Sequence, residues 1–231
     1  MLGRTVVPRL ILRGRAALGL LNGGSCNRLL REFSLNTEKS RFDWDRSGCK
    51  TKEDLLKFKV NKHPETELYY LHDPNGKPLS FWHSIPRKFE GTSEYQYNCV
   101  VEIPHNRLAK LEMSKEITSN PIVQDKKKHP ITGEKVDRYY YIFPPFTYGF
   151  IPQTFESPKP DAAVNNLLGD SDPIDVVEVS GWQTAPGDVI QVNVFGCLPL
   201  VDQGEIDYKI LAIRADHPLA VCLTITPGQD H

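Results

Sequence analysis

Residues 169–179 read Gly-Asp-Ser-Asp-Pro-Ile-Asp-Val-Val-Glu-Val, and this stretch places three aspartates at the mouth of a predicted strand over Val176–Val179. Pro173 fixes its own φ and pushes Asp172 toward an extended conformation, so the carboxylates leave a stiff turn. Like charges about 4 Å apart repel by roughly 4 kcal/mol at an effective dielectric of about 20. The stretch therefore indicates either a site for a hard divalent cation, such as Mg²⁺, Mn²⁺ or Ca²⁺, or a solvated acidic turn that caps a strand.

Around this turn the chain consists of short apolar runs separated by turn residues, a pattern that predicts a mainly β fold without internal repeats. Strands are expected on both sides of the turn, over residues 68–71, 98–103, 110–113, 189–195 and 208–213. Residues 124–133 are rich in lysine and predict an exposed basic hairpin.

A second acidic turn ends at Asp207 and is followed by Lys209. On an extended chain Asp207 and Lys209 share a face, and so do Lys110 and Glu112. On its own, the pair of Lys110 and Glu112 reads either as part of a site or as a surface ion pair worth under about 1 kcal/mol. The second acidic turn repeats the pattern of a strand with a cation beside a carboxylate.

The composition of the 231 residues, 39% hydrophobic and 25% charged, is sufficient for one good core with an appended segment. The net charge is −1, but residues 1–33 hold six of the 28 basic residues and only one of the 29 acidic ones. The remainder therefore has 22 basic and 28 acidic residues, or about −6. An acidic body argues against general binding to nucleic acid or anionic membranes, unless a local basic patch offsets it.

The five cysteines are scattered, odd in number and without a C-x-x-C pair. They read as free thiols in a reducing compartment and exclude a disulfide framework or a zinc site.

Residues 1–33 are arginine-rich with short apolar pieces and resemble a mitochondrial transit peptide cut after Phe33, or else a disordered tail. The apolar pieces are too short for a membrane span, which needs about 20 residues. We expect the mitochondrial matrix, with the cytoplasm or a plastid as alternatives. Residues 34–97 are expected to form an N-terminal arm with short β elements, and residues 36–67 suggest no chemistry.

Six segments, in order between Cys99 and Ile213, resemble the family I soluble inorganic pyrophosphatases of the eukaryotic branch. The matching segments are Val101–Pro104, Ala109–Glu112, Tyr148–Gly149, Pro152–Thr154, Gly169–Asp175 and Asp202–Lys209. The resemblance covers about half the chain. It implies a five-stranded OB-like closed barrel with flanking helices in a domain over residues 98–231.

The resemblance also implies hydrolysis of pyrophosphate to two orthophosphates, several Mg²⁺ ions per site, and a homodimer as one assembly. It assigns a role to each of several residues. Asp170, Asp175 and Asp207 would hold Mg²⁺, Asp202 and Glu112 would serve further ions, and Glu102 would reach an ion through water. Asp172 would be the general base on the attacking water, and Lys110, Arg138, Tyr148 and Lys209 would hold the phosphates. This inventory suits the chemistry, because divalent cations acidify water and neutralise phosphate charge.

Departures from the family pattern leave a second hypothesis open. Ser171 replaces the usual Asn, and Gln203 a usual Glu. Family members continue to a Tyr-Lys pair and a closing helix, whereas this chain ends 22 residues after Lys209 and residues 221–231 read as no helix. The chain would then be a truncated, inactive or weakly active member that binds divalent metal or acts as a partner subunit.

Two other classes fit the sequence less well. A calcium-binding EF-hand loop needs Gly where Asp175 falls. An OB-type nucleic-acid binder is disfavoured because no strand interleaves basic and aromatic residues.

Overall fold

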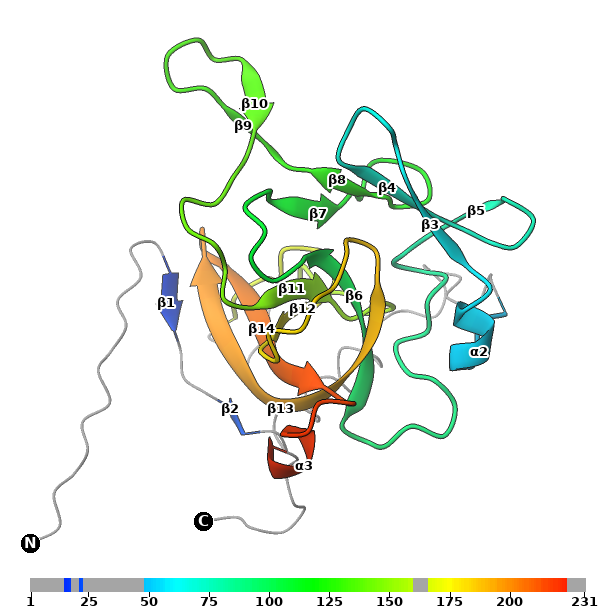
Figure 1. Ribbon diagram of the computed structural model, residues 1–231. Coiled ribbons are helices and arrows are strands. Elements are labelled where there is room, and N and C mark those ends of the chain that lie inside the picture. Colours follow the sequence, from blue (N-terminus) through cyan, green and yellow to red (C-terminus); the bar gives the residue numbers. More distant parts are fainter. Residues whose placement is uncertain (1–14, 18–20, 23–47, 160–165, 224–231) are drawn as a thin grey trace, which may run out of the picture.

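Strands dominate the part of the chain that the computed structural model describes, which is residues 15–17, 21–22, 48–159 and 166–223 (Figure 1). The strands are β1 (Arg15–Ala17), β2 (Leu21–Asn22), β3 (Lys59–Lys62), β4 (Leu68–His72), β5 (Pro78–Leu79), β6 (Gln96–Ile103), β7 (Leu111–Met113), β8 (Ile122–Gln124), β9 (Lys126–Lys128), β10 (Lys135–Asp137), β11 (Thr147–Phe150), β12 (Asp175–Glu178), β13 (Val189–Asp202) and β14 (Glu205–Arg214). The helices within these residues are α2 (Lys52–Leu55) and α3 (Ala220–Leu223). The expectation of a mainly β fold is confirmed.

The largest sheet is organised around a circuit of five strands. The order β13–β14–β12–β11–β6 is hydrogen-bonded from neighbour to neighbour, and β13 also pairs with β6, so the pairing returns to its first strand. Only the β12–β14 pairing within this circuit is parallel. In Figure 1 the long strands β13 and β14 curve around the shorter ones. The short strands β1 and β2 pair with the C-terminal half of β13.

The interior of this circuit is apolar because inward-facing positions alternate along each strand. On β13, Val192 and Val194 are fully buried, and the buried side shifts to Cys197 after a register shift between Val194 and Gly196. A bulge of this kind bends a strand while it keeps its apolar side chains inside. Val176, Ile210 and Ala212 complete the same cluster from β12 and β14.

The close approach of β11 to β6 requires a glycine. A Cβ at Gly149 would overlap the carbonyl oxygen of Val100, and the register between these strands shifts at Tyr148 and Gly149. Only glycine tolerates such an approach of two backbones. Tyr148 is half-buried between the buried residues Thr147 and Gly149.

A second sheet, in the order β3–β4–β8–β7 with β5 on the side of β4, packs against the first through its own apolar cluster. Phe81, Ile85 and Ile122 are fully buried there beside Val100 and Phe150 of the first sheet. Partly buried Phe58, from the expected N-terminal arm, joins this cluster. The predicted basic hairpin is formed by β9 and β10, which project from the body (Figure 1).

The helices in the described part of the chain are short. Each of the two in the described ranges has four residues, and α2 is held by a capping box in which Thr51 and Asp54 bond to each other's backbone. The prediction that residues 221–231 contain no helix is wrong for residues 221–223, which belong to α3. Residues 224–231 and most of the predicted transit peptide lie outside the described residues. Among the residues that the structure describes, no helix is long and apolar enough to cross a membrane.

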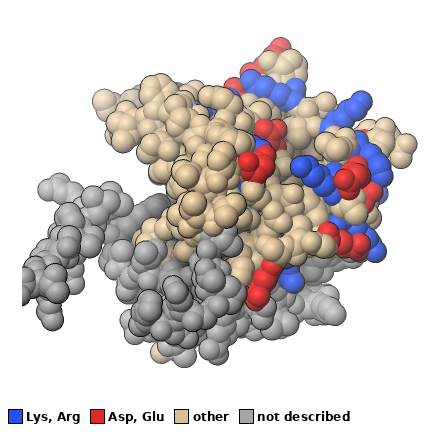
Figure 2. All heavy atoms as spheres, turned by 60° about the horizontal axis from the view of Figure 1, so that its bottom comes forward, with Lys and Arg blue, Asp and Glu red and all other residues tan. Residues whose placement is uncertain are grey.

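Charges on the body are mixed in sign. On the face in Figure 2, lysine and arginine atoms lie next to acidic atoms and form no separate basic field. Ion pairs on exposed segments fit this picture, as between Lys126 and Asp137 at 2.8 Å on the basic hairpin.

Candidate active site

The aspartate turn, residues 169–175, is locked by its own backbone and by a neighbouring loop. The amide of Asp172 donates to Asp170 Oδ1 at 2.9 Å, and Ser171 adopts a left-handed φ of 66°. That conformation favours Gly and Asn, so the Ser is tolerated at some cost. The Glu156 amide donates to the Asp172 carbonyl at 2.8 Å, and the Ser171 amide donates to the Glu156 carbonyl at 3.0 Å. The turn is therefore fixed against residues 154–156, the loop that lies beside it.

Parallel pairing brings the two acidic turns together. Asp175 is the first residue of β12 and lies opposite Lys209 of β14 in the register of these strands. Lys209 Nζ donates to both Asp175 Oδ2 and Asp207 Oδ1. The Tyr148 hydroxyl, from β11, donates to Asp175 Oδ2 at 2.5 Å. Three neighbouring strands thus supply one polar cluster.

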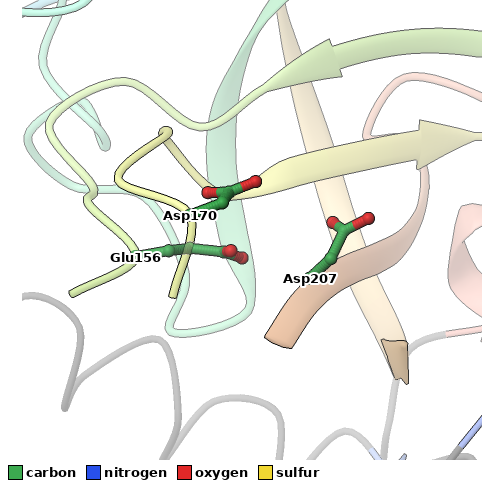
Figure 3. Close-up of side chains that lie close together, drawn as sticks. All are labelled: Glu156, Asp170 and Asp207. Carbon is green, nitrogen blue, oxygen red and sulfur yellow. The ribbon is translucent and has the colours of Figure 1, made fainter. Parts of the chain in front are cut away.

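A group of three acids adjoins this cluster. Carboxylate oxygens of Glu156, Asp170 and Asp207 all lie within 4.8 Å of one another, and Figure 3 shows the three side chains gathered from a loop, the aspartate turn and β14. Asp170 and Asp207 were predicted as ligands, and Glu156 was not. A single glutamate in a loop has no sequence signal, apart from its place just after the Pro152–Thr154 segment.

Burial and mutual repulsion raise the pKa of several of these acids. Burial, with the charges of Asp172, Asp175 and Asp207, raises the pKa of Asp170 to about 6. Burial and nearby carboxylates also raise the pKa of Asp175 and hold that of Glu156 well above its usual value. Burial alone would lower the pKa of Lys209, but Asp175 and Asp207 outweigh it and raise that pKa. One lysine thus faces several acids, and the group is short of positive charge.

The donor set fits a hard divalent cation. All candidate donors are carboxylate oxygens, which Mg²⁺, Mn²⁺ and Ca²⁺ prefer. Glu156 Oε2 is buried and has no hydrogen-bond partner among the described residues. A buried polar atom without a partner is costly unless a ligand satisfies it.

A second polar group contains other predicted residues. Lys110 Nζ donates to Glu112 at 2.8 Å and to Asp125 at 3.0 Å, and Arg138 donates to the same Asp125 oxygen at 3.0 Å. Burial would lower the pKa of Lys110, but Glu112 and Asp125 outweigh it and raise that pKa. Asp125 was not predicted, although it joins the two basic residues proposed to hold phosphate.

Three further predicted residues have separate surroundings. Buried Glu102 accepts a hydrogen bond from the Met113 amide at 2.6 Å, and burial, with the charge of Asp175, holds its pKa well above the usual value. Asp172 is half-exposed and lies 2.6 Å from Lys115 Nζ. Asp202 is the last residue of β13, opposite Glu205, and is not part of the three-acid group.

Comparisons with known proteins agree on one family. A sequence model of the family described as inorganic pyrophosphatase matches residues 99–226. The chain is 41% identical over 150 residues to an inorganic pyrophosphatase of Schizosaccharomyces pombe, an alignment that covers 64% of this chain and 50% of that protein.

Solved structures give the same result. The crystal structure of a type I inorganic pyrophosphatase from Toxoplasma gondii is similar with a TM-score of 0.63 and 35% identity, over 72% of this chain and 73% of that one. An N-terminally truncated vacuolar soluble pyrophosphatase of Trypanosoma cruzi, in complex with PPi, has a TM-score of 0.61 and 32% identity, over 72% and 68% of the two chains. The chain spans about half the length of the curated relatives that it matches.

Proposed function

Because the chain belongs to the inorganic pyrophosphatase family, we propose that it hydrolyses inorganic pyrophosphate to two orthophosphates. The observation that carries this proposal is the meeting of two acidic turns, distant in sequence, beside one lysine and one tyrosine. Asp170 and Asp175 come from the first turn, and Asp207 and Lys209 from β14.

We assign the cation site to Asp170, Asp175 and Asp207, with Asp202 and Glu112 for further Mg²⁺ ions and Glu102 acting through water. Mg²⁺ bound there would lower the pKa of water from ~16 toward ~7 and neutralise charge on the phosphates. The shortage of positive charge around Asp170, where burial and neighbouring acids raise the pKa to about 6, supports this assignment.

Asp172 is our candidate for the general base. Asp172 lies on the same turn as Asp170, but its side chain is half-exposed. It forms an ion pair with Lys115 and is not part of the buried group of acids. A carboxylate outside the ligand set and open to water can take a proton from the attacking water.

Four residues are proposed to hold the phosphates. Lys209 is held between two carboxylates and lies 5.5 Å from the centre of the Tyr148 ring, so both side chains are fixed next to the acids. Lys110 and Arg138 are fixed as a pair by Asp125. Charged donors in fixed positions stabilise charge that develops on phosphoryl oxygens.

The five-strand circuit is proposed to be the closed OB-like barrel. Its support is the double pairing of β6, with β11 on one side and β13 on the other. In this arrangement the site lies outside the apolar interior, on side chains near the start of β12 and within β14.

Release of phosphate from pyrophosphate tests the proposed function. The purified chain is assayed with Mg²⁺, with Mg²⁺ removed by a chelator, and as Asp172→Asn, beside a version extended to the length of the relatives. We expect turnover that needs both Mg²⁺ and Asp172. No turnover in either length of chain would contradict the proposal and favour the second hypothesis, a member that binds metal or acts as a partner subunit without catalysis.

The mitochondrial matrix and a homodimer are further proposals. The first is supported by the arginine-rich residues 1–33, and its test is whether these residues carry a fluorescent protein into mitochondria. The second is inferred from the family resemblance, and light scattering of the purified chain would measure the assembly.

A further inference from the structure

Glu156 connects the two acidic turns. Its backbone makes two hydrogen bonds with the aspartate turn, at 2.8 Å to Asp172 and 3.0 Å from Ser171. Its Oε1 accepts a hydrogen bond from the Tyr208 amide at 3.0 Å, between Asp207 and Lys209 on β14. One residue therefore fixes the distance between the turn and the strand whose acids meet.

The other carboxylate oxygen of Glu156 remains unexplained by these contacts. The residue is 2% exposed, and Oε2 has no hydrogen-bond partner among the described residues. Figure 3 shows the side chain extended toward the space shared with Asp170 and Asp207. The lysine that serves Asp175 and Asp207 makes no ion pair with Asp170 or Glu156 in the described part of the chain.

We propose that Glu156 is itself a ligand of a divalent cation, which it binds together with Asp170 and Asp207. Three carboxylates within 4.8 Å of one another repel, and a cation among them removes the repulsion and satisfies the buried oxygen. The inference takes a cation at this cluster from the proposed function, but it assigns a ligand that the family resemblance did not supply.

The competing explanation is that Glu156 only joins the turn to β14. The two explanations predict opposite orders of variants. Gln keeps an oxygen that accepts from the Tyr208 amide but loses the charge, whereas Asp keeps the charge on a side chain that is one methylene shorter. A ligand role ranks the affinity for Mn²⁺ as wild type, then Glu156→Asp, then Glu156→Gln. A purely connecting role places Glu156→Gln beside wild type and Glu156→Asp below both.

The matched control is Glu178, the last residue of β12. It is also fully buried, its Oε1 accepts from the amides of Ser180 and Arg214 at 2.7 and 3.1 Å, and its Oε2 also has no partner among the described residues. It is not part of the three-acid group. Glu178→Gln therefore reproduces the chemical change of Glu156→Gln away from the proposed ligands.

The experiment measures Mn²⁺ binding to the full chain by titration calorimetry and by the electron paramagnetic resonance signal of free Mn²⁺. We expect Glu156→Gln to weaken binding about tenfold to a hundredfold, and Glu178→Gln to leave it unchanged. Thermal unfolding without metal should show Glu156→Gln folded and at least as stable as wild type, because a repelling charge is gone.

Two results would overturn the proposal. The first is an Mn²⁺ affinity of Glu156→Gln equal to that of wild type. The second is a Glu156→Gln chain that does not fold without metal, because the carboxylate would then have a structural role. Neither depends on turnover. If the wild-type chain binds Mn²⁺ in the predicted order of variants but releases no phosphate, the proposed function fails and the ligand assignment stands.

Discussion

Two groups of acidic side chains in this molecule differ in what balances their charge. Just before β4, Glu67 bonds to Lys62 at 2.9 Å and also to Arg107 and the Tyr69 hydroxyl. Burial would raise the pKa of Glu67, but these partners outweigh it and lower that pKa. In the three-acid group, burial and neighbouring acids instead raise the pKa of Asp170, to about 6.

The opposite directions of these two pKa shifts distinguish a structural network from a binding site. The Glu67 network is complete within the described residues, because each carboxylate oxygen has a donor. The three-acid group concentrates negative charge beside one lysine and leaves a buried oxygen without a partner in the described part of the chain. Buried charge that is not balanced by neighbouring side chains is expected at functional sites, where a bound ligand of opposite charge balances it.

The largest effect should follow from removal of Asp175. Its carboxylate holds both Lys209 and Tyr148, and it is a proposed Mg²⁺ ligand. We expect Asp175→Ala to abolish Mg²⁺-dependent release of phosphate, whereas Glu67→Ala should keep it. Turnover retained in Asp175→Ala would refute the ligand assignment and remove the contrast between the two groups.

Replacement of the proposed general base should have a smaller and more selective effect. Asp172→Asn is expected to lower the rate of phosphate release by ~10²–10⁴, the usual worth of a positioned base, while Mn²⁺ affinity stays close to that of wild type. The matched control is Asp137→Asn on the basic hairpin, where the aspartate pairs with exposed Lys126 at 2.8 Å. An unchanged rate in Asp172→Asn would exclude Asp172 from the mechanism.

Local sequence could predict the two acidic turns but not every residue that joins them. The Asp207 and Lys209 pair was readable because alternate residues of a strand share a face. Glu156 was not readable, because its bond to the Tyr208 amide joins residues far apart in the sequence. Asp125 was missed for the same reason, since Lys110 and Arg138 meet it only after three segments fold together.

The strands show the same limit. The run over residues 189–195 was predicted to stop before Gly196 and Pro199, yet β13 continues to Asp202. The register shift near Gly196 and the long pairing with β14, including Pro199 opposite Tyr208, keep the strand intact. Proline and glycine mark strand ends in a local reading, and a bulge in a long hairpin overrides that signal.

The pH dependence of the metal-free chain should reveal the crowded acids. A folded-state pKa of about 6 for Asp170, against 3.8 when unfolded, gives stability that is fully present below pH 3.8 and is lost as the pH rises through 6. Replacing Asp170 by Asn should remove this loss, so the difference in unfolding free energy between variant and wild type should grow from pH 4 to pH 7. Urea unfolding in the presence of a chelator measures it. A difference that is constant with pH would show that Asp170 is not crowded.

The smallest effect should come from the balanced network and should have the opposite sign with pH. The lowered pKa of Glu67 gives stability that is present above the unfolded pKa near 4.5 and is lost as the pH falls through the lower folded value. Glu67→Gln should therefore cost about 1 kcal/mol of unfolding free energy at neutral pH, because the partners are partly exposed, and this cost should vanish in acid. Urea unfolding at pH 7 and pH 3 measures both values. Mn²⁺ affinity should not change, because Glu67 belongs to a network whose charge is already balanced. A loss of Mn²⁺ affinity in Glu67→Gln would mean that the two acidic groups are coupled and that local charge balance does not separate structure from function in this molecule.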